Sequence, residues 1–315
     1  MTSGAPLPVL VVGEALIDVV VRPDAEREEH VGGSPANVAL GLGRLEVPVR
    51  LRTALAHDAH GERIVSHLAA SGVTVDAESF VLARTATAIA QIDVDGSARY
   101  EFDVEWKIDS AVSLDGVGIL HVGSVGCFRR PGAEAVAALV RAADVEVTFD
   151  PNVRPALIGD PSEVVPIVEA IAARARIVKL SDEDADWLYP GYAADDVLDR
   201  LLERGAGQVV VTLGGDGAIL ASPSARVEVS APRTRIRDTV GAGDAFMAAL
   251  VHALSTGTLG DGNAAALGRL GRRCAVAAAL TVSRAGADLP SARGLGRALS
   301  RDALGRRLSQ GSGGY

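Results

Sequence analysis

Aromatic residues, cysteines and lysines are scarce in this chain of 315 residues. Phe, Trp and Tyr make up 3% of the sequence, so the core must be built mainly from Ala, Val, Leu and Ile. The two cysteines, Cys127 and Cys274, are isolated and form no CxxC pair, which argues against a disulfide framework and favours the reducing cytoplasm. The six histidines show no spacing suited to a metal site.

Several functional signals are also missing. The net charge is −9, lysine occurs only at 107 and 179, and no basic run provides the face that nucleic-acid binding needs. No apolar run is long enough to span a membrane, and residues 1–8 carry no basic signal region. The P-loop, the strand-linked GxGxxG fingerprint and the GxSxG elbow are absent.

What the sequence does contain is an alternation of apolar strands and helices. Its length suits about two domains, or one large α/β unit with an appendage. Continuous apolar strands separated by helices predict a mostly parallel sheet covered on both faces. Strands are expected at 9–12, 49–54, 118–122, 145–149, 177–180 and 208–213, and helices at 33–45, 61–70, 133–143, 161–173 and 194–205.

A β-rich segment interrupts this alternation. Residues 73–104 show short alternating strands, and Asp95-Gly96 predicts a hairpin turn between 89–94 and 98–102. Together with residues 15–31 they are predicted to form a small β lid. Residues 308–315 are predicted to be a disordered tail.

The most informative segment is DTVGAGD at 238–244. Gly241 and Gly243 let the backbone approach a ligand, and residues 245–251 favour a helix whose N-terminus would attract a phosphate. Asp244 would repel an anion, but it suits a general base that takes a proton from a hydroxyl attacking phosphorus. The alternative is a glycine turn followed by an acidic residue in the first helical turn.

The segment GGSPAN at 32–37 opens another expected helix. Its glycines would let a polyhydroxy ligand press against the backbone, while Asn37 offers a donor and acceptors. The alternative is a turn with Ser34 as N-cap. Asp18 suits recognition of vicinal hydroxyls, or it is an exposed carboxylate at a strand end.

Polar clusters follow four strands, at the edge where open α/β sheets bind ligands. They lie at 13–18, 150–155, 181–184 and 214–217. Arg154 is a candidate phosphate clamp, or it pairs with Asp150. Asp184 is a candidate Mg2+ ligand through water, or it belongs to an acidic first helical turn. Residues 212–217 form a turn and a candidate nucleotide contact.

In this order the segments at 32–37 and 238–244 resemble the two signatures of the PfkB/ribokinase family of carbohydrate kinases, and the likeness covers nearly the whole chain. It implies a ribokinase-like three-layer α/β sandwich with a β lid, ATP as phosphoryl donor, Mg2+, and a sugar or nucleoside acceptor. Residues 121–124 and 149–155 are similar to the fructokinase and 2-keto-3-deoxygluconate kinase branch.

The resemblance also implies roles for individual residues. Asp244 would be the base, the amides of Gly241, Ala242 and Gly243 the anion hole, and Arg154 a further charge clamp. The substrate contacts would be Asp18, Gly32, Gly33 and Asn37, with Tyr100 and Phe102 as candidates from the lid. The nucleotide contacts would be Thr212, Gly214, Gly217, Ser181 and Asn152. Asp184 stands where the family commonly has Glu, and K+ is implied near Asp238 and Val240.

We therefore predict an ATP-dependent kinase that phosphorylates a hydroxyl of fructose or a related ketose. The alternatives are a 2-keto-3-deoxygluconate kinase, another sugar or nucleoside kinase, and a catalytically silent sugar- or nucleotide-binding regulator. The intact Asp244 argues against the regulator. A homodimer through the lid is expected because an exposed sheet edge is costly.

Overall fold

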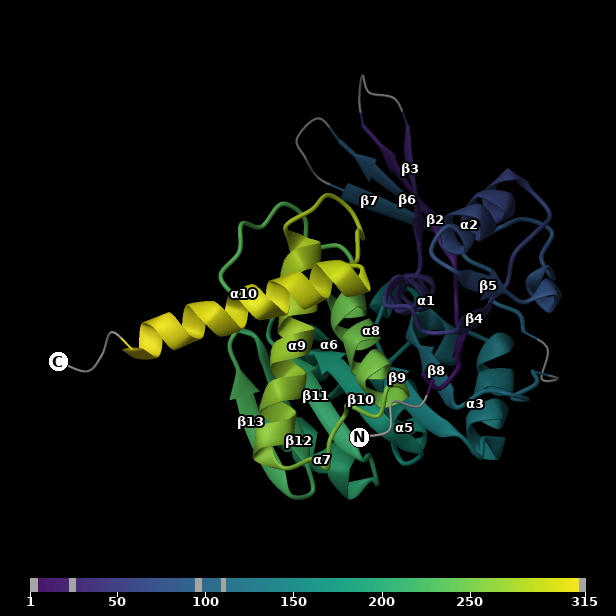
Figure 1. The fold of residues 1–315 in the computed structure, drawn as a ribbon. Coiled ribbons are helices and arrows are strands. Elements are labelled where there is room, and N and C mark those ends of the chain that lie inside the picture. Colours follow the sequence, from purple (N-terminus) through teal and green to yellow (C-terminus); the bar gives the residue numbers. More distant parts are fainter. Residues whose placement is uncertain (1–4, 23–26, 94–97, 109–111, 312–315) are drawn as a thin grey trace.

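The large sheet forms the centre of the molecule (Figure 1). The computed structural model describes residues 5–22, 27–93, 98–108 and 112–311. The strand order is β13-β12-β11-β10-β9-β8-β1-β4-β5, with parallel pairing from β11 to β5 and antiparallel pairing of β12 and β13 at one edge. The strands are β1 (Val9–Val12), β4 (Val49–Arg52), β5 (Val73–Val75), β8 (Ile119–Gly123), β9 (Glu146–Asp150), β10 (Ala175–Ser181), β11 (Gln208–Thr212), β12 (Ala218–Ser222) and β13 (Ala225–Val229).

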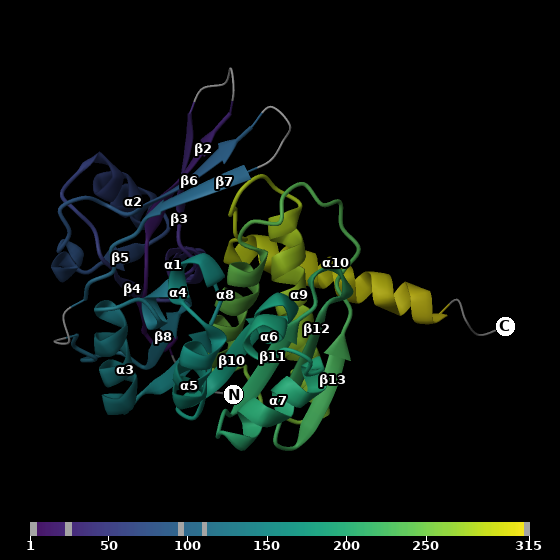
Figure 2. The same cartoon turned by 180° about the vertical axis from the view of Figure 1, so that it is seen from behind.

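Helices cover both faces of this sheet, as Figures 1 and 2 show from opposite sides. One layer contains α1 (Ser34–Arg44), α2 (Ala59–Ala69), α8 (Ala242–Ser255) and α9 (Ala264–Val282). The other contains α3 (Gly132–Ala142), α5 (Pro161–Ala172), α6 (Asp182–Leu188) and α7 (Ala194–Glu203), with the short α4 (Pro155–Ile158) after β9. The predicted three-layer arrangement is confirmed.

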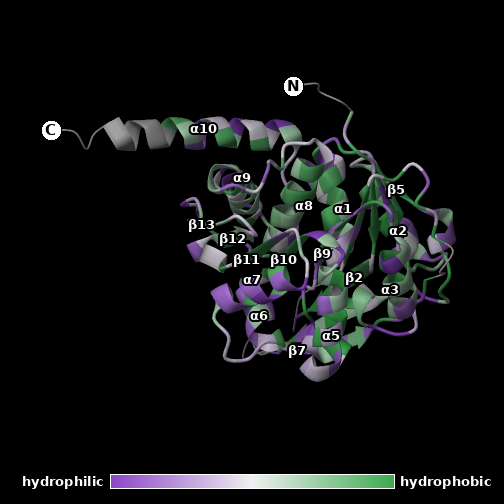
Figure 3. Cartoon of the chain, turned by 90° about the horizontal axis from the view of Figure 1, so that it is seen from below, coloured by the Kyte–Doolittle hydropathy of each residue, from purple (hydrophilic) through white to green (hydrophobic). Residues whose placement is uncertain are grey.

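The alternation of side chains along β1 explains the two layers. Val9 and Val11 pack in the core with α1 and α8, while Leu10 and Val12 pack in the core with α3 and α5. Successive side chains of a strand point to opposite faces, so a strand that is apolar throughout is buried on both sides. Figure 3 shows the resulting concentration of hydrophobic residues in α1 and α8.

The lid is a separate sheet that rises above the main body in Figure 1. Its strands, in the order β3-β2-β6-β7, are β2 (Leu16–Val21), β3 (Glu28–Gly32), β6 (Thr87–Ile92) and β7 (Ala98–Asp103). The expected lid segment 73–104 begins too early, because β5 pairs with β4 in the large sheet. The apolar alternation of a short edge strand does not reveal which sheet it joins. The predicted turn at 95–96 lies outside the described residues.

The C-terminal helix α10 (Ala292–Gly311) extends away from the body (Figures 1 and 3). Residues 308–311 continue this helix, so the predicted disordered tail is wrong there, and residues 312–315 lie outside the described part. Leu295 is buried, which ties the first turns of α10 to the core. No helix in the described ranges is both long and apolar enough to cross a membrane.

Candidate active site

A cavity of about 700 Å³ lies where the carboxyl ends of five parallel strands meet the lid. Residues that follow β1, β8, β9, β10 and β11 line it, together with the N-terminus of α8. Three lid strands contribute Asp18, Ala88 and Phe102. The structure therefore brings the four predicted polar clusters together at one sheet edge. We call this space the polar cavity.

Asp244 lies in the first turn of α8 and is 8% exposed. Its Oδ1 accepts a hydrogen bond from the Ser34 hydroxyl at 2.7 Å, and its Oδ2 accepts one from the Asn37 side-chain amide at 2.8 Å. Both partners come from the first turns of α1, which packs against α8. The carboxylate is thus fixed in direction at the wall of the cavity, as a general base must be.

The predicted role of Ser34 as an N-cap is wrong. The N-cap of α1 is Gly33, which has φ 96° and makes no side-chain cap. A Cβ at this position would lie 2.6 Å from the carbonyl oxygen of Glu14, so only glycine fits this turn without strain. Ser34 becomes the first helical residue, and its hydroxyl is available to Asp244.

The glycine cradle begins α8 as predicted. Gly241 is the N-cap, with φ 77° in the left-handed region, and Gly241, Ala242 and Gly243 all line the polar cavity. The Ala242 N–H also donates to the Thr239 carbonyl at 3.3 Å, which closes the turn. The first amides of a helix lack intrahelical acceptors, so this end suits an anion.

Lys179 was not identified from the sequence, and it lies beside the cradle. Its Nζ is 3.2 Å from the position that a Cβ on Gly243 would take, and it donates to Asp150 Oδ2 at 2.8 Å. Burial opposes the charge of Lys179, but the Asp150 and Asp184 carboxylates offset this and raise its pKa. The available sequence signal was that Lys179 is one of only two lysines in the chain and has apolar neighbours in the expected strand 177–180.

The ion pair of Lys179 bears on one of the two interpretations of Arg154, the salt bridge with Asp150. Asp150 is paired with Lys179, so the predicted alternative of an Arg154–Asp150 salt bridge is wrong. Arg154 lines the polar cavity and donates to Asn152 Oδ1 at 2.8 Å and to the Val153 carbonyl at 2.9 Å. Asn152 also lines the cavity, with φ 38°.

The lid side of the cavity holds most of the predicted substrate contacts. Asp18, Gly33, Asn37 and Phe102 line it. Burial raises the pKa of Asp18, while the charges of His30 and Arg154 act in the opposite direction. Tyr100 belongs to β7, but its side chain lies outside the described set.

Gly32, a predicted substrate contact, lies next to Asp18. It is a described residue that is not part of the cavity lining. A Cβ there would lie 2.0 Å from Asp18 Oδ2, so this glycine makes room for the Asp18 carboxylate. Its contribution to a substrate site is therefore indirect.

Glu14 forms part of the cavity wall beneath the lid and is 4% exposed. The Gly126 N–H donates to its Oε2 at 3.0 Å. Burial raises the pKa of Glu14 to about 7, although hydrogen bonds from Ser124 and Gly126 act in the opposite direction. From the sequence, Glu14 was predicted only as a member of the polar cluster at 13–18, with no role of its own.

Asp184 lines the cavity, but both of its oxygens accept backbone hydrogen bonds. Oδ1 accepts from the Val153 N–H at 2.7 Å and Oδ2 from the Ser181 N–H at 2.9 Å. The Ser181 hydroxyl in turn accepts from the Asp184 N–H, which completes a capping box. The predicted acidic first turn is present, and Asp184 joins the loops after β9 and β10.

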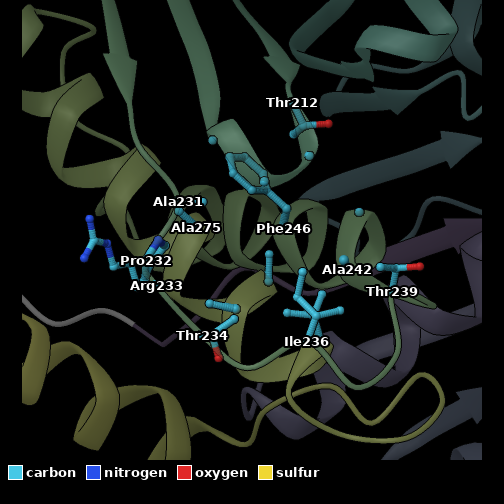
Figure 4. Close-up of a pocket in the computed structure, with 17 residues that line it drawn as sticks. Thr212, Ala231, Pro232, Arg233, Thr234, Ile236, Thr239, Ala242, Phe246 and Ala275 are labelled. Atoms are coloured by element: carbon cyan, nitrogen blue, oxygen red, sulfur yellow. The ribbon is translucent and has the colours of Figure 1, made fainter.

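A second cavity, of about 370 Å³, adjoins the first and is shown in Figure 4. Phe246 reaches it from α8, whereas Pro232, Thr234 and Ile236 come from the segment after β13. The side chains of α9 that line it are small and apolar. The lining contains three of the predicted nucleotide contacts, Thr212, Gly214 and Gly217, while Ser181 and Asn152 line the polar cavity instead. We call this space the apolar cavity.

The two cavities share the residues at the start of α8. The residues common to both linings are Thr212, Gly214, Thr239, Ala242 and Gly243. A ligand with an apolar end and an anionic end can therefore lie across both, with its anionic end at the cradle and next to Asp244.

Asp238 and Val240 flank this junction. Asp238 Oδ1 accepts from the Val240 N–H at 3.0 Å and Oδ2 from the Gly286 N–H at 2.8 Å, and these bonds lower the pKa of Asp238. Within the described residues, no group of three or more His, Cys, Asp or Glu side chains is arranged to hold a metal ion.

A parallel α/β sheet with a β lid, two adjoining cavities and a buried carboxylate beside a helix N-terminus define a phosphotransferase with an alcohol as acceptor. The chain matches pfkB family carbohydrate kinase over residues 8–292. A fructokinase from Rhizobium leguminosarum bv. trifolii is 33% identical over 264 residues, which cover 80% of this chain and 81% of the relative. This protein belongs to the pfkB family of carbohydrate kinases.

Solved structures agree with this assignment. Fructokinase from Xylella fastidiosa with bound ATP has a TM-score of 0.79 and 25% identity, covering 94% of this chain and 99% of that one. A fructokinase double mutant from Vibrio cholerae O395, with fructose, ADP and potassium bound, has a TM-score of 0.74 and 25% identity, covering 91% and 95%. The predicted ribokinase-like fold and sugar-kinase class are confirmed.

Proposed function

We propose that this protein is a fructokinase, which transfers the γ-phosphoryl group of ATP to a hydroxyl of fructose or a related ketose, with Asp244 as the general base. The observation that carries the proposal is the position of Asp244. It is buried, is oriented by two hydrogen bonds, and lies next to the glycine cradle shared by both cavities.

In this mechanism Asp244 accepts the proton of the attacking hydroxyl. The free amides of the α8 N-terminus stabilise the charge on the transferring phosphoryl group. Lys179, behind Gly243, adds a fixed positive charge at the same place, and Asp150 holds that charge in position. Arg154 can leave its own loop to bind phosphate oxygens, because it is exposed.

The apolar cavity suits the adenine of ATP. Apolar groups from α9 and Ile236 can pack on both sides of a planar base, and Thr212, Gly214 and Gly217 supply the turn next to it. The phosphates would then run along the shared residues towards Asp244. Bound ATP in the Xylella fructokinase structure supports ATP as the nucleotide.

The charges of the polar cavity support a requirement for Mg2+. Among the described residues, five carboxylates and two cations line it besides Glu14, whose pKa is raised: Asp18, Asp182, Glu183, Asp184 and Asp244, against Arg154 and Lys179. Such a surface repels a triphosphate unless a divalent ion compensates. Oxygen donors suit Mg2+, so Glu183 and Asp184 would hold it through water. The ion would neutralise phosphate charge when bound. We also propose K+ near Asp238 and Val240, supported by potassium in the Vibrio structure.

The same charges favour a neutral ketose over a keto acid. Lys179 is paired with Asp150, and in this mechanism Arg154 binds the phosphate oxygens, so neither cation is left to receive a substrate carboxylate. Arg99, a cationic residue of the lid strand β7, is not part of the described cavity lining. Asp18 and Asn37 instead offer acceptors and donors for sugar hydroxyls.

The decisive experiment is a coupled ADP-release assay over fructose, other ketoses, 2-keto-3-deoxygluconate and nucleosides, with product masses determined. We expect the highest kcat/KM with fructose or a close ketose. A higher value for the keto acid or a nucleoside would reject the proposed substrate. Tight binding in calorimetry with no phosphorylated product would instead indicate the non-catalytic regulator.

We further propose a homodimer through the lid and a cytoplasmic location. Within the described residues, the edge strand β7 of the four-stranded lid pairs with one strand, β6, whereas α2 contacts the other edge strand, β3, through Arg63 and Glu29. Both cysteines are buried and unpaired, which suits a reducing compartment. Sedimentation at micromolar concentration tests the dimer, and a purely monomeric protein would exclude it.

A further inference from the structure

Both oxygens of the Asp244 carboxylate already have a hydrogen-bond donor. The Ser34 hydroxyl is 2.7 Å from Oδ1, and the Asn37 amide is 2.8 Å from Oδ2. Ser34 and Asp244 are 210 positions apart in the sequence, so this contact depends on the packing of α1 against α8. Hydrogen bonds to an ionised carboxylate are strong, so the contact holds the base in one direction.

The two donors are chemically different. Asn37 presents an amide N–H, which donates a hydrogen bond but does not give up its proton at neutral pH. Ser34 presents an O–H, the same group that the acceptor sugar must present to the base. Asn37 is buried, whereas Ser34 is half-buried and borders the open cavity together with Gly241 and Gly243.

An acceptor hydroxyl that binds Oδ1 therefore competes with the Ser34 hydroxyl already there. Water is the other hydroxyl compound that can reach an open polar cavity and accept a phosphoryl group, and its attack would waste ATP. While Ser34 donates to Oδ1, its hydroxyl competes with a water molecule for that oxygen of the base.

We propose that Ser34 is a positioning residue that reserves Asp244 for the sugar and suppresses hydrolysis of ATP when no sugar is bound. The proposal rests on the proposed role of Asp244 as base. On sugar binding, the acceptor hydroxyl replaces Ser34 at Oδ1, while Asn37 keeps the carboxylate oriented. No covalent change occurs at Ser34.

The test compares ATP hydrolysis without sugar to sugar phosphorylation in wild type, Ser34→Ala and Ser34→Thr. In Ser34→Ala we expect the rate of ATP hydrolysis without sugar to rise, and the ratio of hydrolysis to sugar phosphorylation to rise about tenfold. Ser34→Thr keeps the hydroxyl and should keep the wild-type ratio. Ser300→Ala, an exposed serine of α10, is the matched control.

Two kinetic outcomes would overturn the proposal: an unchanged ratio in Ser34→Ala, or an equal rise in Ser34→Thr. A third is phosphate on Ser34 after incubation with MgATP, detected by peptide mass spectrometry, because the hydroxyl would then be an acceptor. Wild type is assayed first with the sugar panel. If it releases no sugar-dependent ADP, the proposed function fails separately from the role of Ser34.

Discussion

The two cavities that meet at the start of α8 differ sharply in their charge. Among the described residues that line the apolar cavity, Arg233 is the only ionisable one, whereas eight ionisable side chains line the polar cavity. The apolar cavity is formed by small side chains of α9 and by the segment after β13. The polar cavity is formed by strand ends and the lid.

The apolar cavity is therefore suited to binding a ligand, and the polar cavity is suited to catalysis. An apolar wall can bind a nucleobase by contact area alone, and it needs no precise charges. A site that moves a proton and a phosphoryl group needs charges fixed by hydrogen bonds, such as Asp244 with Ser34 and Lys179 with Asp150. Changes in one cavity should therefore leave the function of the other largely intact.

The largest expected effect comes from Asp244→Asn. This change removes the proton acceptor while keeping the side-chain shape, so kcat should fall by about 10³-fold or more. Nucleotide affinity, which depends on the other cavity, should change by less than about threefold. ADP release and nucleotide calorimetry measure the two, with Asp115→Asn at an exposed site as control. Near-normal turnover would show that Asp244 is not the base.

A pH-dependent effect on stability is expected from Glu14. Its pKa is about 7 in the folded protein, against 4.5 for a glutamate in water. Because the folded pKa is raised, its stabilising contribution is full below pH 4.5 and is lost as pH rises through 7. The lost contribution is roughly 3 kcal/mol.

Urea unfolding at pH 5 and pH 8 measures this contribution. The free energy of unfolding of Glu14→Gln, relative to wild type, should be higher at pH 8 than at pH 5, because the variant does not ionise. Parallel changes in the two proteins would contradict the buried, uncharged state of Glu14.

The charge beside the cradle is best tested with a double variant. Lys179→Met alone leaves Asp150 buried and unpaired, which is strongly destabilising. Lys179→Met with Asp150→Asn removes both charges, so the fold should survive while kcat falls by about 100-fold. Thermal melting checks the fold, and ADP release measures kcat. Full activity in the folded double variant would mean that Lys179 is only structural.

The smallest effects are expected from single substitutions in each cavity. Each should alter the KM for one substrate only. Ile236 is 64% exposed and lines the apolar cavity, so Ile236→Ala should raise the KM for ATP by roughly threefold to tenfold without affecting stability. Asp18→Asn should raise the KM for the ketose by about tenfold. Each variant should leave the other KM unchanged. If either variant altered both KM values equally, the two cavities would not act independently.

Much of this arrangement was predictable from local patterns. The alternation of apolar strands and helices predicted the parallel sheet, and the polar clusters after its strands predicted the edge at which the cavity lies. The glycine pattern at 238–244 predicted the helix start, because only glycine takes the left-handed conformation of Gly241 without strain. These features depend on neighbouring residues, so periodicity and turn chemistry reveal them.

Other features were not accessible in this way. β5 was assigned to the lid, although it pairs in the large sheet, since pairing is not encoded in the strand itself. For Ser34, the sequence offered only the alternative of a cap on its own helix. Lys179 had no assigned role, and the apolar wall contributed by α9 was not predicted.

By itself, the sequence determined the class of fold, the family signatures and the residue proposed as general base, because each depends on residues close together in the chain. The tertiary structure alone decided what surrounds that residue. Ser34 reaches Asp244 across 210 positions, and Lys179 reaches Gly243 from a separate strand. Hydrogen bonds and charges act over a few ångströms of space, whatever the distance along the chain, so only the packed fold shows which side chains they join.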